Sequence, residues 1–115
     1  MRKTDKKIDN QIRIALTNVC DKALIEIDGF QWLTHLVNYS NFPNSLKVIC
    51  VFNTNESLSA FLEKGNGDHL MALVHENLTD IGVNVKDITA HVLYDTEENC
   101  EKEHNGKWAE RWGKY

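Results

Sequence analysis

Apolar residues between positions 8 and 27 recur every three or four positions, which is the spacing of one buried helix face. Thr4 or Asp5 is placed to cap the start of this helix. Asp28-Gly29 is placed to end it, because glycine adopts the left-handed conformation without a side-chain penalty. A helix with one apolar stripe needs a surface to pack against, and we expect a sheet. The apolar positions are Ile8, Ile12, Ala15, Leu16, Val19, Ala23, Leu24 and Ile27.

Two strand patterns follow this helix. Residues 30–39 are rich in aromatic and β-branched side chains, and residues 46–52 read Leu-Lys-Val-Ile-Cys-Val-Phe. The stretch between them, 40–45, is rich in turn-forming residues, so the pattern predicts a hairpin with a long loop. Loops of this kind often carry contacts, which makes Tyr39 and Phe42 candidate partner-binding residues.

Two helices and a third strand come next. Helical spacing predicts helices over 57–64 and 69–81, with Asp68 as the cap of the second and a glycine after each. A third strand is expected within 83–94, most clearly at 88–94, where side chains alternate. The order α-β-β-α-α-β predicts one α+β domain spanning 1–115. Its three-stranded sheet is expected to carry the first and third helices on one face.

The C-terminal region predicts a short helical segment beyond the sheet. Asp95 is placed as a helix cap, with Glu98 three positions on as in a capping box. Trp108 and Trp112 are four residues apart, and Tyr115 follows three later, so on a helix they form an aromatic stripe. We take these three residues as a candidate interface.

The two hairpin strands have apolar side chains on both faces. Ile49 and Val51 alternate with Val48 and Cys50, so helices on one side leave a second apolar face. Such a face in water marks an interface. Two coverings are open: the segment with Trp108 and Trp112 folding back, or a second copy of the chain.

Charge and composition restrict the function classes. The chain has 13 Lys and Arg against 17 Asp and Glu, a net charge of −4, which gives no global attraction for nucleic acid or an anionic membrane. Three cysteines, Cys20, Cys50 and Cys100, are an odd number on regular elements and predict reduced thiols. We find no signal-peptide pattern and no apolar run long enough to span a bilayer. We expect a cytoplasmic protein without a cofactor.

A metal-dependent hydrolase is one alternative. Cys100 and His104 share a helix face and are candidate metal ligands, yet two ligands do not complete a zinc site. His35 can be combined with Asp95 and Cys100 as a nucleophile constellation, but no nucleophile elbow or paired-acid motif surrounds them. A hydrogen-bonded sheet histidine is the preferred interpretation, and no catalytic residue is assigned.

Nucleic-acid binding is a second alternative. Helices 57–64 and 69–81 have the outline of a helix-turn-helix, but the second contains no Lys or Arg, which argues against reading DNA. The element order also matches the type II KH fold, whose glycine loop clamps RNA backbone. Here the loop 64–68 reads Lys-Gly-Asn-Gly-Asp. The basic ends, 2–7 and 102–114, with Tyr39 and Phe42, are the residues such an RNA or ribosome binder would use.

Five segments of the chain together carry a family resemblance. They are Met1-Arg-Lys-Thr-Asp-Lys-Lys, Asp28-Gly-Phe-Gln-Trp-Leu-Thr-His-Leu-Val-Asn-Tyr, Phe42-Pro-Asn-Ser-Leu-Lys-Val, Asp95-Thr-Glu-Glu-Asn-Cys and His104-Asn-Gly-Lys-Trp. With these segments the chain resembles a family of small proteobacterial proteins labelled as Fis-family transcriptional regulators. The resemblance covers essentially the whole chain and implies a C-terminal helix-turn-helix for DNA, with no established catalytic residues. In this sequence the C-terminal region is instead an acidic helix followed by the tryptophan stripe.

The leading hypothesis is a small non-enzymatic interaction or regulatory domain that binds a protein partner or itself as a homodimer. It combines a strand pair that is apolar on both faces with a middle helix pair that lacks a basic surface. RNA binding, transcriptional regulation and metal-dependent hydrolysis remain the alternatives.

Overall fold

The computed structural model describes residues 2–112 of the chain. The expected α+β class and the order α-β-β-α-α-β, followed by a helical C-terminal segment, are confirmed. Short 3-10 turns, Tyr39–Asn41 and Ile88–Ala90, interrupt the loops before β2 and β3. The main elements are α1 (Lys3–Glu26), β1 (Phe30–Leu36), β2 (Lys47–Phe52), α2 (Asn55–Glu63), α3 (Gly67–Asp80), β3 (Val92–Thr96), α4 (Glu97–His104) and α5 (Trp108–Trp112).

The sheet is mixed, with β2 in the centre and the strand order β1-β2-β3. β1 pairs antiparallel to β2, with a register shift between Phe30 and Trp32, and β3 pairs parallel to β2. β1 and β3 are therefore the two edge strands. The parallel pairing is possible because α2 and α3 form the long crossover from β2 to β3.

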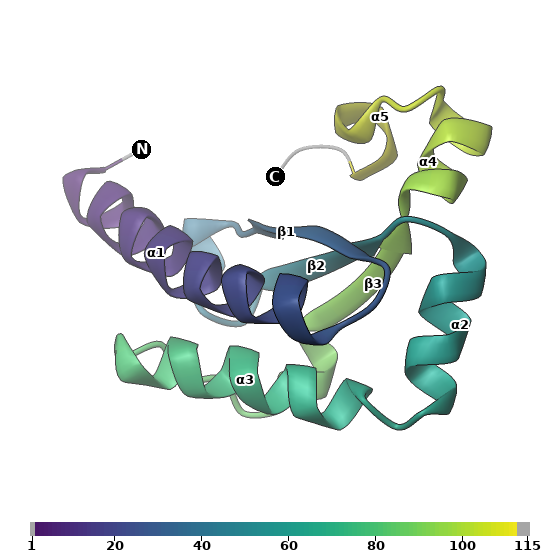
Figure 1. Cartoon of the computed structure of the whole chain (residues 1–115). Helices are drawn as coiled ribbons and strands as arrows, with labels where there is room; N and C mark the ends of the chain where they lie inside the picture. Colours follow the sequence, from purple (N-terminus) through teal and green to yellow (C-terminus); the bar gives the residue numbers. More distant parts are fainter. Residues whose placement is uncertain (1, 113–115) are drawn as a thin grey trace.

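The hydrophobic core lies between one face of the sheet and helices α1 and α3, as expected (Figure 1). Most of the apolar stripe predicted for α1 is buried and packs against α3 as well as β1, but the prediction is wrong for Leu24, which is 51% exposed. Burial of each large side chain contributes roughly 1.5–3 kcal/mol. The fully buried members include Ile12, Leu16 and Val19 of α1, Val48, Cys50 and Phe52 of β2, and Leu70, Val74 and Leu78 of α3.

The opposite face of the sheet is also buried at its centre. Ile49 and Val51 are 0% exposed, which confirms that β2 is apolar on both faces. Helices α4 and α5 lie on this side of the sheet, opposite α1 and α3 (Figure 1). The C-terminal segment therefore lies over the face of the sheet opposite the main core.

Several predicted boundaries are wrong. The third strand covers Val92–Thr96 rather than 88–94, because the Asp87 carboxylate accepts hydrogen bonds from the amide and hydroxyl of Thr89 and starts a 3-10 turn there. The cap residue of α1 is Arg2 rather than Thr4 or Asp5. The cap position of α3 is Asn66, not Asp68. In each case the helix or turn begins earlier than the apolar spacing indicates.

The predicted cap of α4 is also wrong, and the actual arrangement links two helices. Thr96, not Asp95, caps α4 by accepting the Asn99 amide at 3.0 Å. Glu98 does not close a capping box on its own helix. Its carboxylate accepts the backbone N–H of Asn55, the first residue of α2, at 2.8 Å. The unsatisfied amides at the start of α2 are therefore partly satisfied from α4.

Candidate functional site

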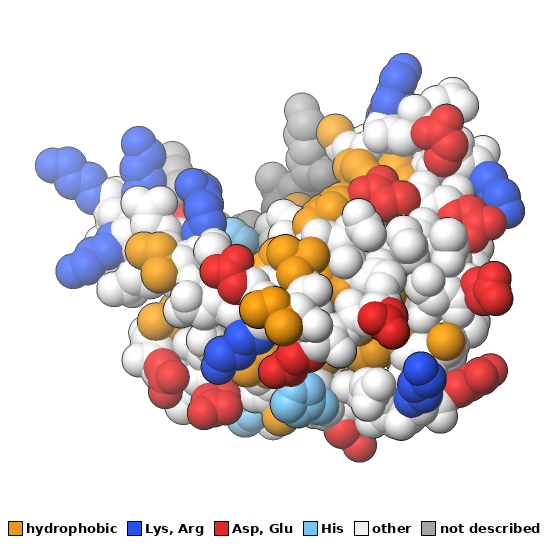
Figure 2. Space-filling model, in the orientation of Figure 1, with side chains coloured by type: hydrophobic (Ala, Val, Ile, Leu, Met, Phe, Trp, Pro, Cys, Tyr) orange, Lys and Arg blue, Asp and Glu red, His pale blue; other side chains and the backbone are white. Residues whose placement is uncertain are grey.

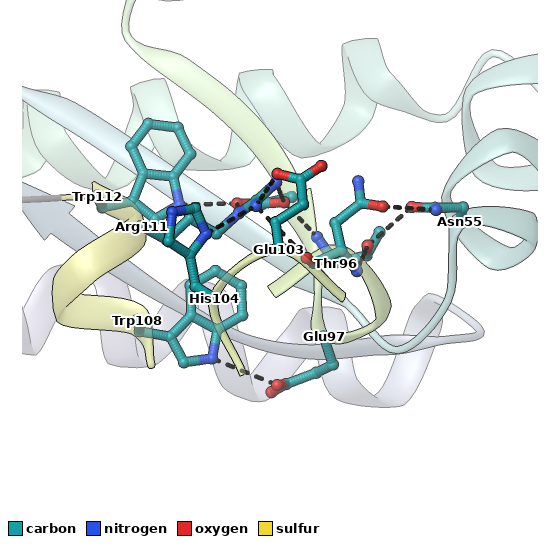
Figure 3. A network of polar contacts seen from close by, with 10 residues as sticks. Asn55, Thr96, Glu97, Glu103, His104, Trp108, Arg111 and Trp112 are labelled. Carbon is teal, nitrogen blue, oxygen red and sulfur yellow. Dashed lines mark hydrogen bonds and ion pairs between the residues drawn. The ribbon is translucent and has the colours of Figure 1, made fainter. Parts of the chain in front are cut away.

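A network of polar contacts joins α5 to β3, and Figure 3 shows Arg111 and Trp112 of α5 within it. Its centre is Asp95. Asp95 is 4% exposed. It accepts two bonds from the Arg111 guanidinium, at 2.5 Å from Nε and 3.0 Å from Nη2, and one at 2.8 Å from Trp112 Nε1. Planar guanidinium and carboxylate groups match each other in this arrangement, which gives a strong and directional ion pair. We call these three residues the C-terminal clasp.

Charge and hydrogen bonding stabilise the ionised form of the clasp. Burial alone raises the pKa of Asp95, but the hydrogen bonds from Arg111, the Thr96 amide and Trp112 outweigh burial and hold that pKa below its ordinary value. The bonds to Asp95 raise the pKa of Arg111. Arg111 also pairs with the more exposed Glu103 at the rim. The clasp therefore holds a salt bridge in which both groups stay charged at neutral pH.

The two tryptophans predicted to form an interface instead contact other residues of the same chain. The Trp108 ring packs edge-on against Trp32 of β1, with 4.8 Å between centroids. Both indole N–H groups donate to Glu97, at 2.6 Å from Trp32 and 3.3 Å from Trp108. Of the two coverings expected for the second sheet face, the described residues show the fold-back of this segment. Tyr115, the third member of the stripe, lies outside the described residues.

The candidate metal ligands do not form a metal site. Cys100 is 0% exposed, and burial raises the pKa of its thiol, which disfavours the thiolate that binds metal. The His104 ring nitrogen lies 3.4 Å from the Arg111 guanidinium. Within residues 2–112, no group of three or more His, Cys, Asp or Glu side chains is arranged to hold a metal ion. The metal-dependent hydrolase has no geometric support there.

A larger concave site lies elsewhere, between α1 and the edge strand β1. This groove has a cavity volume of about 470 Å³, and we call it the α1/β1 groove. One wall is a single face of α1, and the other is the middle of β1. The lining residues are Asp9, Arg13, Leu16, Thr17, Cys20 and Asp21 of α1 and Leu33, Thr34 and His35 of β1. Concave sites of this size are the usual places for ligands in proteins.

A polar cluster at one end of the groove explains the mid-strand histidine. Asp9 Oδ1 lies 2.8 Å from His35 Nε2 and accepts the Tyr39 hydroxyl at 2.7 Å. Its other oxygen accepts the Arg13 guanidinium at 3.0 Å. Burial raises the pKa of Asp9, but these hydrogen bonds outweigh burial and lower it overall. His35 is therefore a hydrogen-bonded sheet histidine, as preferred from the sequence, and its partner is Asp9 rather than Asp95.

The middle of the groove contains an outward-facing part of the β1 edge. Val48 donates its backbone N–H to His91 on the β3 side, so its antiparallel partner His35, and Leu33 two residues before it, turn their backbone groups away from β2. The Leu33 backbone lies beside Cys20 of α1, where it partly offsets the burial that raises the pKa of the Cys20 thiol. Cys20 is half-buried, whereas Cys50 and Cys100 are fully buried. Backbone groups in an antiparallel edge strand alternate in direction, so His35, two residues on, faces the groove as Leu33 does. Sequence reasoning missed this site because Asp9, Cys20 and His35 are far apart along the chain.

The glycine loop that suggested a KH fold has unfavourable electrostatics for RNA. The groove beside it, of about 340 Å³, is lined by three carboxylates, Glu26, Asp28 and Glu56, and by one cation, Lys64. A phosphate clamp needs a positive surface. The helix after the loop, α3, contains no Lys or Arg, so it also lacks the charge of a DNA-reading helix. α5, in the C-terminal region, is five residues long and is held to the sheet by the clasp.

Comparisons with known proteins do not assign the chain to a group. No family model matches the sequence, and neither the curated proteins nor the solved structures contain a match. Among the described residues, no helix has the length and apolar character needed to cross a membrane.

Proposed function

We propose that the chain is a non-enzymatic interaction domain that binds an extended segment of a partner protein in the α1/β1 groove. The observation that carries this proposal is the position of the β1 edge. β1 pairs on one side only, with β2, and its other side faces the groove next to α1. A groove between an edge strand and a helix accepts a peptide as an added strand, with backbone hydrogen bonds for affinity and side-chain pockets for specificity.

The hydrogen bonding at the edge favours strand addition. On the groove side the Leu33 amide lies beside the Cys20 thiol, and sulfur is a weak acceptor. A carbonyl of an incoming peptide is a stronger acceptor, so its exchange with the thiol is favourable. The His35 backbone provides the next position along the strand, because outward-facing groups recur every second residue. Side chains of Thr17 and Thr34 add hydroxyl groups for contacts with the peptide.

The groove fits a single extended segment better than a second copy of this domain. α1 runs beside β1 and reaches it through Cys20, so the entrance is bounded by a helix. A second β1 strand would bring its own α1 with it, and that helix would meet the first one. The polar groups of the groove also point to binding rather than reaction. His35 and Tyr39 are both engaged with Asp9, so the cluster orders the wall of the groove.

Peptide selection followed by NMR tests this proposal. Random peptides displayed on phage are selected against the full-length protein, and a selected peptide is titrated into labelled protein. We expect the largest amide shifts at Leu33 and His35. Thr17→Trp places a large ring in the groove and should abolish binding, whereas the matched exposed variant Asn18→Trp should not.

Three results would contradict the proposal. The first is that no peptide is enriched. The second is that the amide shifts lie outside the groove, or that Thr17→Trp binds as well as Asn18→Trp. The third is a concentration-dependent dimer whose formation shifts the same amides, which would assign the groove to a second copy. Alkylation gives an independent check, because Cys20 is the accessible thiol and its modification should block the peptide.

A further inference from the structure

The start of α1 carries a concentrated positive charge. Between residues 2 and 13 there are five Lys and Arg and two Asp, whereas the whole chain has a net charge of −4. Figure 2 shows basic side chains gathered on the projecting N-terminal end of α1, at the left of the view. The first two turns supply four of them, Arg2, Lys3, Lys6 and Lys7, and all four are exposed. We call these four residues the basic end.

The two acids in this stretch neutralise only one residue of the basic end. Asp5 is paired with Arg2 at 3.6 Å, and Asp9 is occupied by Arg13, His35 and Tyr39. Among residues 2–112, no ion pair involves Lys3, Lys6 or Lys7. Exposed lysines on a short stretch of helix attract polyanions strongly at low salt, and this attraction is screened as salt is added.

An aromatic pair lies beside the basic end. The Tyr39 hydroxyl donates to Asp9 of α1 at 2.7 Å, which holds the loop after β1 against the N-terminal half of the helix. The rings of Tyr39 and Phe42 are 5.5 Å apart between centroids and tilted by 34°. Both side chains are half-buried, so part of each ring reaches the surface. The sequence had identified the two features separately, and the fold places them next to each other.

We infer that this surface binds single-stranded nucleic acid. The lysines of the basic end contact phosphates, and a base stacks on the Tyr39 and Phe42 rings. Lysine clusters combined with aromatic platforms are the recurring chemistry of single-strand binding. Stacking of bases on aromatic rings adds affinity that a lysine cluster alone does not give, and it tolerates any base because every base has a π-face. The surface is separate from the glycine loop and its carboxylates, and it does not depend on peptide binding in the α1/β1 groove.

Fluorescence anisotropy of a labelled single-stranded RNA oligonucleotide, measured with the full-length protein between 50 and 200 mM salt, tests the inference. Each phosphate contact contributes about −0.7 to the slope of log affinity against log salt, so the three lysine contacts predict a slope of about −2.1 and a loss of about 18-fold over this range. The triple variant with Lys3, Lys6 and Lys7 replaced by Gln should remove most of this slope.

A matched triple variant controls for net charge. Lys22, Lys86 and Lys107 are exposed lysines outside the basic end, and their replacement by Gln should leave most of the slope intact.

A second pair of variants isolates stacking. Tyr39→Leu removes the ring and should weaken binding by at least about 5-fold without changing the slope, whereas Tyr39→Phe keeps the ring and should bind as the native protein does. Circular dichroism confirms that each variant is folded.

Several outcomes would overturn the inference. One is the absence of RNA binding even at 50 mM salt. Another is an equal loss of affinity in the two triple variants, because net charge alone would then explain the binding. Equal affinities of the Tyr39→Leu and Tyr39→Phe variants would remove the stacking platform. Binding to vesicles that contain anionic lipid, with no binding to RNA, would assign the basic end to a membrane surface instead.

Discussion

Replacing Arg111 with methionine should destabilise the protein more than any other single change in the C-terminal segment. Methionine keeps most of the length of the side chain but removes both guanidinium bonds to Asp95. The Asp95 carboxylate is 4% exposed, so water cannot readily replace the lost donors. It keeps only the Trp112 indole and the Thr96 amide as partners. In the variant the buried Asp95 carboxylate therefore keeps two of its four hydrogen bonds.

The size of the effect follows from the burial of the pair. Breaking a buried ion pair by removing one partner costs about 3–5 kcal/mol. Because two donors remain on Asp95 and the Arg111 side chain is 14% exposed, we expect a loss of about 3 kcal/mol in the free energy of unfolding. Glu103 also pairs with Arg111, but its side chain is 58% exposed. Glu103→Gln should therefore cost less than about 1 kcal/mol.

Urea unfolding followed by tryptophan fluorescence measures both losses. All three tryptophans of the chain, Trp32, Trp108 and Trp112, lie in or beside the clasp, so they report directly on the segment. Combining Arg111→Met with Asp95→Asn should give a coupling energy of about 2 kcal/mol. Equal losses in the Arg111→Met and Glu103→Gln variants would refute the reasoning, because burial would then have no influence on the strength of the pair.

Three further outcomes follow from the same structure. Because folding lowers the pKa of Asp95, the carboxylate contributes its full stability above its ordinary pKa of 3.8 and loses that contribution as pH falls through the lower folded value. The free energy of unfolding of Asp95→Asn should therefore depend less steeply on pH below 3.8 than that of the native protein. Identical acid titrations of the two proteins would contradict this. Gly29→Ala should lower the melting temperature in thermal unfolding more than Gly82→Ala does. Both glycines have positive φ, but a Cβ at Gly29 would lie 2.5 Å from a side-chain carbon of α2, whereas the space at Gly82 is open. Replacing Trp108 and Trp112 together with Ala should uncover the second sheet face and increase the fluorescence of a hydrophobic dye, and an unchanged signal would show that other groups cover that face.

The fold was predictable where one periodicity dominates. α1 and α3 each bury one apolar face and β2 is buried on both faces, so in these elements the pattern in the sequence and the packing agree. The third strand was misplaced because Asp87 competes for the backbone of Thr89 with a local turn. Alternation of side chains carries no information about that local hydrogen bond.

The candidate sites were less predictable, because each depends on residues that are distant in the sequence. From the sequence Asp95 is interpreted as a helix cap, and only the fold brings Arg111, sixteen positions later, into contact with it. Asp9 and His35 are twenty-six positions apart, and only the packing of α1 against β1 joins them. Tyr39 and Phe42 were identified from their loop, but their position beside the basic end of α1 was not evident. A titratable side chain in a single sequence gives no sign of which distant partner it will meet.

The shared cap between α4 and α2 has a consequence for how the protein is synthesised. Asn55, the first residue of α2, gives its backbone N–H to Glu98, and its side chain contacts Thr96 and Asn99. These partners leave the ribosome more than forty residues after Asn55 does. The nascent chain therefore cannot complete the start of α2 until β3 and the first turn of α4 have emerged, so α2 does not reach its final stability on its own.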